Sequence, residues 1–403
     1  MDFDALILNA RQRQSLATVR TLGRRGLRVA AVATRGDDVP TFSSRWCTRA
    51  FEFPGEESPD EYLAALEDWL ERFRATVLIT SHDGTIALVR QHRERLGARL
   101  RLALASESAL EVAVNKERTL GVARQLGLHV PREVAVRDAA ELPAALNQVG
   151  LPAVIKPSES WMRRGQAGGW VGSRLVVNEA EARRAAAPVT EMGGTVLCQA
   201  FLTGRREAVS FLRAGGEIKA RFAQWARRTH PPLGGQSVLR QSIAVPGDVG
   251  TQAEALIHEI DLDGYSEVEF RRDAAGVPYL MEINPRLSAS VEVAVRSGID
   301  FPYLHYQWAT GGPVDGVTYY RTGVWMRHLG GDIEALIATL GDRGRPGVSP
   351  PARAVVDFGL SFCVPVGYDY FHWSDPLPAC RASLAFVRRM TRRIVSRARK
   401  ALR

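Results

Sequence analysis

The fold is decided by the stretch Ser266-Glu-Val-Glu-Phe-Arg-Arg-Asp-Ala-Ala-Gly-Val-Pro-Tyr-Leu-Met-Glu-Ile-Asn-Pro-Arg286. Its pattern predicts two paired strands, 266–271 and 278–283, joined by a hairpin-like turn. Side chains two apart on a strand share a face, so the acidic and amide groups of each strand gather on one side. Burying carboxylates among Val, Phe, Leu and Ile is costly unless a cation neutralises them. The stretch therefore favours a buried cation site over a solvated edge strand.

The oxygen ligands of this hairpin are those that Mg²⁺ prefers. Glu269 and Glu282 supply carboxylates, Asn284 supplies a neutral oxygen, and Pro285 ends the second strand. Arg286 follows at once and is placed to meet an oxyanion. A Mg²⁺ pair bridging nucleotide phosphates would balance these charges.

Two lysines form the expected cationic complement. Lys116 opens a helix after Asn115, and Lys156 ends an apolar strand just before Pro157, where a solvated role is unfavourable. A lysine acts as a point charge and suits a phosphate. The glycine-rich loop 165–172 offers backbone N–H groups for phosphate oxygens, although a flexible hairpin explains it equally well.

The amino-terminal part predicts a parallel α/β layer. Apolar strands at 5–8, 28–32 and 77–80 alternate with helices at 15–25 and 61–74. The first turn lacks a GxGxxG motif, so no dinucleotide site is expected. Residues 81–84 follow the third strand and predict either a helix cap or a substrate-facing turn.

Taken together, these motifs resemble the ATP-grasp fold, in the branch of carbamoyl-phosphate synthase and biotin carboxylase. The resemblance covers about 115–309, and includes 198–204 with the sequence Cys-Gln-Ala-Phe-Leu-Thr-Gly. It implies an α/β and α+β protein: a Rossmann-like parallel α/β pre-ATP-grasp domain, an ATP-grasp fold and a carboxyl-terminal extension. The expected boundaries are 1–110, 111–196 for the small lid subdomain, 197–330 for the large subdomain and 331–403.

The resemblance also implies roles for individual residues. Phosphate contacts are expected from Lys116, Lys156, Gly168 and Gly169. Adenine would lie on the hinge residues Gln199, Ala200, Phe201 and Leu202, with the ribose on Glu207. The metal ligands would be Glu269, Glu282 and Asn284, and the catalytic residues Arg286, Lys156 and Arg240. Arg240 is the expected carboxylate clamp, since guanidinium pairs bidentately with carboxylate, but it could equally be a surface strand residue.

The implied activity is an ATP-dependent carboxylate–amine ligase that works through an acyl phosphate and releases ADP and phosphate. Its cofactors would be ATP and Mg²⁺, with Mn²⁺ as an acceptable substitute, and a homodimer is compatible with it. An ATP-dependent carboxylase and a non-catalytic ATP-binding regulator recruited to membranes are the alternatives.

The net charge of +9 belongs to the carboxyl terminus. Residues 381–403 hold nine basic and no acidic residues, and apolar residues recur there every three or four positions. This predicts a basic amphipathic helix that either lies on an anionic membrane or docks its apolar stripe on the protein. Nucleic-acid binding is not expected, because interleaved aromatic residues are missing. Without a signal peptide or a long apolar run, we expect a cytoplasmic protein, peripheral at the inner membrane surface if the tail binds lipid.

Overall fold

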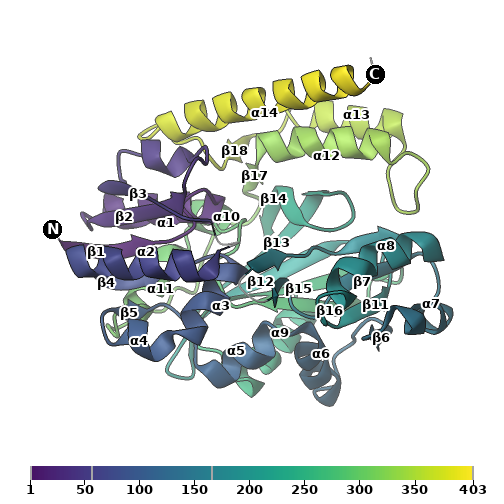
Figure 1. Ribbon diagram of the computed structural model, residues 1–403, viewed down its shortest axis with the longest axis horizontal. Coiled ribbons are helices and arrows are strands. Elements are labelled where there is room, and N and C mark those ends of the chain that lie inside the picture. Colours follow the sequence, from purple (N-terminus) through teal and green to yellow (C-terminus); the bar gives the residue numbers. More distant parts are fainter. Residues whose placement is uncertain (1, 56–57, 165–166, 402–403) are drawn as a thin grey trace.

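The amino-terminal sheet is parallel, with the strand order β3-β2-β1-β4-β5, in the computed structural model, which describes residues 2–55, 58–164 and 167–401 (Figure 1). Its central strands are buried on both faces, as is usual for parallel sheets. The expected Rossmann-like layer is confirmed. Its elements are β1 (Asp2–Ile7), α1 (Arg13–Arg24), β2 (Val29–Thr34), β3 (Arg49–Phe53), α2 (Pro59–Arg72), β4 (Arg74–Ile79), α3 (Asp83–Gln91), α4 (Arg93–Gly97) and β5 (Arg101–Leu102), with a 3₁₀ turn at Pro40–Ser43.

The lid follows the linking helices α5 (Glu107–Ala113) and α6 (Lys116–Gln125). Its sheet is antiparallel in the order β10-β7-β11-β6, and β8 and β9 form a separate hairpin. One buried cluster, drawn only from residues 136–198, fills the lid, so its core is separate from the others. Its elements are β6 (Glu133–Val136), α7 (Leu142–Val149), β7 (Ala153–Pro157), β8 (Trp161–Arg164), β9 (Ala167–Trp170), β10 (Arg174–Val176), α8 (Glu179–Thr190) and β11 (Val196–Ala200).

The large sheet has the order β16-β15-β12-β13-β14-β17-β18. It shares both remaining cores with the amino-terminal sheet, so these two parts pack as one body. The expected hairpin is β15 with β16. The elements are β12 (Arg206–Ala214), β13 (Glu217–His230), β14 (Gln236–Ile243), α9 (Gly247–Glu259), β15 (Gly264–Arg272), β16 (Pro278–Asn284), α10 (Glu292–Ser297), α11 (Phe301–Ala309), β17 (Trp325–Arg327), α12 (Leu329–Gly341), α13 (Pro351–Leu360), β18 (Val366–Tyr368) and α14 (Leu377–Ala401).

The carboxyl-terminal extension is joined to both other parts. Strand β18 pairs with β17 at the edge of the large sheet. Asp369 lies between Arg13 of α1 and Arg240 of β14, and Asp375 pairs with Arg20 of α1 at 2.9 Å. The extension is therefore held to the large sheet by strand pairing and to α1 by ion pairs. The charged partners lie hundreds of positions apart, so no local pattern could reveal them.

Helix α14 runs beside α12 and α13 (Figure 1), and the Arg393 guanidinium lies 2.9 Å from Glu334 of α12. The predicted amphipathic helix is confirmed. Its apolar stripe is not docked as one alternative required, because Leu384, Val387 and Ile394 are 51, 58 and 63% exposed. The stripe's last member, Leu402, lies outside the described residues.

Candidate active site

The hairpin β15–β16 places its polar residues opposite one another. Glu269 faces Glu282 across the strand pair, and Glu267 faces Asn284. The Asn284 amide donates a hydrogen bond to Glu269 Oε1 at 3.2 Å. Arg206 of the neighbouring strand β12 approaches Glu269 Oε2 at 2.5 Å. Two carboxylates and an amide thus converge on one face of the large sheet.

The pKa values of the two carboxyl groups shift in opposite directions. Burial, together with the charges of Glu282 and Glu267, raises the pKa of Glu269 to about 7 against the opposing effect of Arg206. Burial also opposes ionisation of Glu282, but Lys116 and Lys156 outweigh it and hold the pKa of that carboxyl below its ordinary value. A divalent cation at this pair would favour the charged form of both groups.

Both predicted lysines approach the pair from the lid side. Lys116 begins α6, whose cap is the Asn115 side chain, and its Nζ lies 3.4 Å from Glu282 Oε2. It also donates to Ser160 Oγ at 2.9 Å. Lys156 of β7 is buried, and its Nζ lies 3.5 Å from the Met281 carbonyl oxygen of β16. Burial and the charge of Lys116 lower the Lys156 pKa to about 8.

The hinge connects the lid to the large sheet. Gln199 lies in β11 and is fully buried, with its Nε2 donating to Glu133 Oε2 at 3.1 Å. Its Oε1 has no hydrogen-bond partner among the described residues. Ala200 ends β11, and Phe201 and Leu202 follow as irregular chain. The hinge thus presents a buried, unsatisfied acceptor.

Arg286 is held by the amino-terminal domain. Its Nε donates to Asp83 Oδ1 at 2.6 Å. Burial opposes the charge of Arg286, but Asp83 reverses this and raises the pKa of the guanidinium. The hairpin's terminal cation is therefore fixed by a residue at the start of α3.

One protein family and several known proteins resemble this chain. Residues 195–331 match the family model described as ATP-grasp in the biosynthetic pathway with Ter operon. The chain is 28% identical over 213 residues to a D-alanine–D-alanine ligase of Xanthomonas axonopodis pv. citri, which covers 48% of this chain and 63% of that relative. Two solved structures resemble it in fold. Biotin carboxylase of Campylobacter jejuni, in its β,γ-ATP complex, has a TM-score of 0.62 at 16% identity, over 80% of this chain and 74% of that chain. An L-amino acid ligase of Bacillus licheniformis has a TM-score of 0.60 at 18% identity, over 76% of this chain and 74% of that chain.

The chain has the ATP-grasp fold. The resemblance and the fold class predicted from sequence are confirmed.

The residues present in this ATP-grasp site fit ATP and Mg²⁺. Gln199 Oε1 is a buried acceptor that the adenine amino group could satisfy. The raised pKa of Glu269 marks a buried carboxylate whose charge Arg206 only partly offsets. No group of three or more His, Cys, Asp or Glu side chains suited to a metal occurs in the described part of the chain. Phosphate and water oxygens would therefore complete the metal shell begun by Glu269, Glu282 and Asn284.

Two predicted contact residues already have partners. Glu207 is buried, and its two oxygens lie 3.1 Å from Arg205 and 2.8 Å from Arg272. Arg240 is fully buried in β14, and its guanidinium faces Asp369 bidentately. Arg240 is therefore not a surface residue, and a substrate carboxylate would have to compete with Asp369 for it.

Residues 167–170 of the glycine-rich loop form β9, which pairs with β8. Gly168 and Gly169 lie on β9, opposite Arg163 and Met162. Gly169 lines a pocket at the edge of the amino-terminal sheet. Residues 165 and 166 lie outside the described residues.

Three residues at this site were not found from sequence. Arg206 and Ser160 contact Glu269 and Lys116, and Asp83 contacts Arg286. Asp83 lies in the 81–84 turn, where the His82 ring caps α3 by accepting from Gly84 N at 3.3 Å. His82 also lines the same pocket as Gly169, and the substrate-facing role of the turn stays a prediction.

Proposed function

We propose that this protein is an ATP-dependent ligase that joins a carboxylate to an amine. The observation that carries the proposal is the convergence of Glu269, Glu282 and Asn284 with two lysines. The chain spans 63% of the length of the curated relative described above, so the activity is inferred from this site rather than transferred.

In the proposed reaction, a carboxylate oxygen attacks the γ-phosphorus of ATP, and the bond to ADP breaks. The resulting acyl phosphate is attacked by an amine, which loses a proton as phosphate leaves. Bound Mg²⁺ would supply Lewis-acid neutralisation of the phosphate charge. Lys116 and Lys156 would hold the phosphates, and Arg286 would stabilise charge on the transferring phosphoryl group.

The test is ADP release across a panel of carboxylates, each with and without a panel of amines. ADP that depends on both partners supports the ligase, whereas ADP that needs only bicarbonate would indicate a carboxylase. Glu282→Ala should reduce turnover by at least about 100-fold, since it removes a metal ligand and charge partner. Glu217→Ala, at an exposed turn carboxylate, is the matched control. Full activity in Glu282→Ala would show that the assigned site is wrong.

A further inference from the structure

A second pocket lies at the carboxyl edge of the amino-terminal sheet. It has a volume of about 330 Å³ and is lined by residues that follow β1, β2 and β4, among them Asn9, Thr34 and His82. Strands β1 and β4 are neighbours whose connections leave in opposite directions, which makes this the topological switch point where open α/β sheets bind ligands. The volume falls within the range of small-molecule sites.

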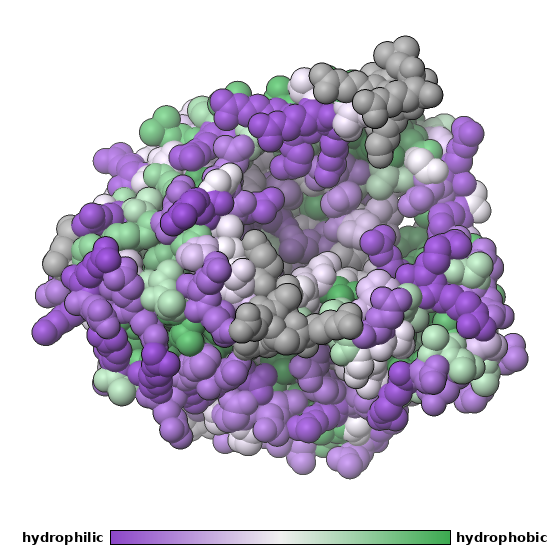
Figure 2. All heavy atoms as spheres, viewed as in Figure 1, coloured by the Kyte–Doolittle hydropathy of each residue, from purple (hydrophilic) through white to green (hydrophobic). Residues whose placement is uncertain are grey.

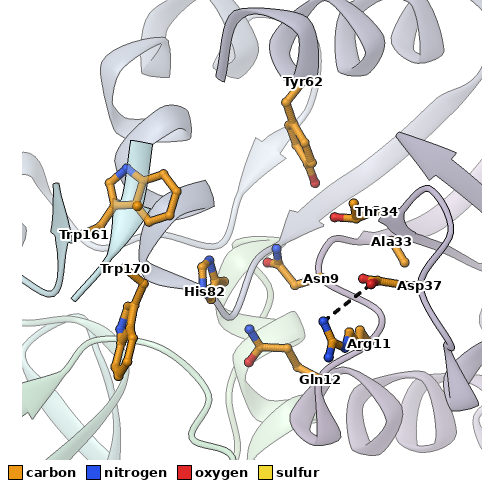
Figure 3. Close-up of a pocket in the computed structure, with 11 residues that line it drawn as sticks. Asn9, Arg11, Gln12, Ala33, Thr34, Asp37, Tyr62, His82, Trp161 and Trp170 are labelled. Carbon is orange, nitrogen blue, oxygen red and sulfur yellow. Dashed lines mark hydrogen bonds and ion pairs between the residues drawn. The ribbon is translucent and has the colours of Figure 1, made fainter. Parts of the chain in front are cut away.

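Aromatic side chains line this pocket from two directions (Figure 3). Trp161 and Trp170, from the β8–β9 hairpin of the lid, lie together on one side, and Tyr62 comes from α2 on another. The Trp161 ring meets the His82 ring edge-on, with centroids 5.9 Å apart. Trp170 is 58% exposed, an unusual position for so large an apolar group beside a cavity. Such rings favour a planar, π-rich ligand in offset or edge-on contact.

Polar groups line the opposite side. Asn9, Gln12 and Thr34 face the pocket with Arg11, whose guanidinium pairs with Asp37 at 3.4 Å (Figure 3). The side-chain oxygen of Asn9, Oδ1, accepts hydrogen bonds from the Thr80 and Thr85 hydroxyl groups at 2.9 and 2.8 Å. These bonds fix the direction of the Asn9 carboxamide. The pocket therefore combines aromatic side chains with an oriented polar end, the composition of a specific small-molecule site.

This pocket shares a lining residue with the candidate active site. Trp161 also lines the adjoining pocket that contains Lys116, Glu282 and Asn284. Asp83, which holds Arg286, follows directly after His82. Figure 2 shows that this face of the molecule is hollowed near its centre.

We propose that the pocket binds the ring-bearing end of one ligation substrate, a small molecule with a planar aromatic or heteroaromatic ring and polar substituents. This deepens the proposed function and rests on it. The ring would lie among Trp161, Trp170 and Tyr62, and its reactive carboxylate or amine would point toward Arg286.

The test measures direct binding to the full chain by calorimetry, with matched probe pairs. Benzoate is compared with cyclohexanecarboxylate, and benzylamine with cyclohexylmethylamine, so that the two arms separate a carboxylate from an amine substrate. In one arm the aromatic probe should bind about 5- to 10-fold more tightly than its saturated partner, and Trp170→Leu should remove that preference. Trp373→Leu, which changes an 88% exposed tryptophan on the extension, is the control.

Equal affinity within both pairs, no binding of either aromatic probe, or an unchanged preference in Trp170→Leu would overturn the pocket assignment. The readout needs no turnover, so it separates the two hypotheses. Ring preference without ADP release for any substrate pair would leave the pocket standing and reject the ligase. ADP release with aliphatic substrate pairs, without a ring preference in binding, would support the ligase and reject the pocket assignment.

A different observation carries a second inference, about α13 and α14. These helices expose Val355, Val356, Leu360, Leu384, Val387, Ile394 and Val395, each between 43 and 63%. We call this set the α13–α14 face. No helix among the described residues is long and apolar enough to cross a membrane.

We infer that the α13–α14 face lies on an anionic lipid surface. Residues 381–403 carry nine basic and no acidic residues, so two copies of this face would place like charges together, whereas anionic headgroups would neutralise them. Exposed apolar groups beside arginines are the composition of an interfacial helix.

Sedimentation with phosphatidylcholine vesicles, with and without phosphatidylserine, tests this inference. The protein should bind only the anionic vesicles, and Val387→Asp/Ile394→Asp should weaken that binding by about 10-fold or more. Tyr319→Asp, at a 77% exposed aromatic residue elsewhere, is the control. Absent or unaltered binding would reject the inference, as would a dimer that the double variant converts to a monomer.

Discussion

The Arg286 guanidinium donates two hydrogen bonds to the Asp83 carboxylate, from Nε at 2.6 Å and from Nη2 at 3.3 Å. Arg286 follows the β15–β16 hairpin, and Asp83 begins α3 of the amino-terminal domain. Through this contact, the position of Arg286 in the candidate active site depends on the amino-terminal domain. Asp83 therefore acts as a positioning residue for Arg286.

Asp83→Asn should lower kcat for ADP release by about 10-fold or more, because Arg286 loses its charged partner and its fixed orientation. The KM for ATP should change little, since the lysines proposed to hold the phosphates are untouched. Steady-state kinetics separates the two parameters. Asp68→Asn, at an exposed ion pair on α2, is the control. If Asp83→Asn lowers the melting temperature as well as kcat, the role of Asp83 is merely structural.

The sequence predicts the local parts of this site well. Alternation along β15 and β16 is enough to place Glu269 opposite Glu282, because a hairpin fixes its own register. Lys156 is equally readable, since its strand is apolar up to the lysine. By contrast, β3 is mostly exposed and its apolar alternation is limited to Phe51 and Phe53, which is too short to predict a strand.

Contacts between distant segments could not be predicted in this way. Asp369 meets Arg13 and Arg240 only after the large sheet and the extension have folded. Arg206 carries no signal that separates it from the other arginines of a basic chain. The same reason hides Arg272, which pairs with Glu207 from a position 65 residues away. Local periodicity predicts helices, strands and their buried faces. The partners of charged side chains can be identified only from the tertiary fold.

The affinity for Mg–ATP should depend on pH near neutrality. Because Glu269 has a raised pKa of about 7, affinity should rise as pH increases through that value and the carboxylate ionises. Because Lys156 has a lowered pKa of about 8, affinity should fall again above it as the lysine loses its charge. Calorimetric titrations between pH 6 and 9 measure this window, in which the optimum should lie at about 7 to 8.

Glu269→Gln should remove the rising limb and leave the falling limb. The stability of the ligand-free protein tests whether the pKa of Glu269 is raised rather than lowered. Since the folded pKa of Glu269 is above 4.5, its ionisation favours unfolding, so its contribution, measured as the stability difference between the unaltered protein and Glu269→Gln, should fall as pH rises from 4.5 to about 7. A flat affinity profile in the unaltered protein would reject both assignments.

Gln199 should contribute to the choice of base. Gln199→Leu keeps the approximate volume but removes the buried acceptor, so the KM for ATP should rise by about 5- to 10-fold, the effect of one hydrogen bond. The KM for a purine triphosphate without the amino group, such as purine riboside triphosphate, should change much less. The comparison of both nucleotides in both proteins isolates that contact. An equal rise for both would show that Gln199 acts only by packing.

The buried ion pairs of Asp369 should dominate the attachment of the extension. Its side chain is 1% exposed, between Arg13 at 6% and Arg240 at 0%. Burial opposes its charge, but Arg240 and Arg13 together hold the pKa of this carboxyl far below its ordinary value. Asp369→Asn would leave two buried guanidinium groups without countercharge, which costs about 3–5 kcal/mol in the free energy of unfolding.

Urea unfolding measures this cost against Asp357→Asn, whose half-exposed carboxylate pairs with Arg227 and Arg228 and should matter less. The lowered pKa of Asp369 also determines how its contribution to stability changes with pH. The Asp369 contribution is complete above its unfolded-state pKa of about 3.9 and is lost only as pH falls below it. The stability difference between the unaltered protein and Asp369→Asn should therefore be constant from pH 6 to 8 and shrink in acid. A difference that grows in acid, or a variant as stable as Asp357→Asn, would mean that packing rather than charge holds the extension in place.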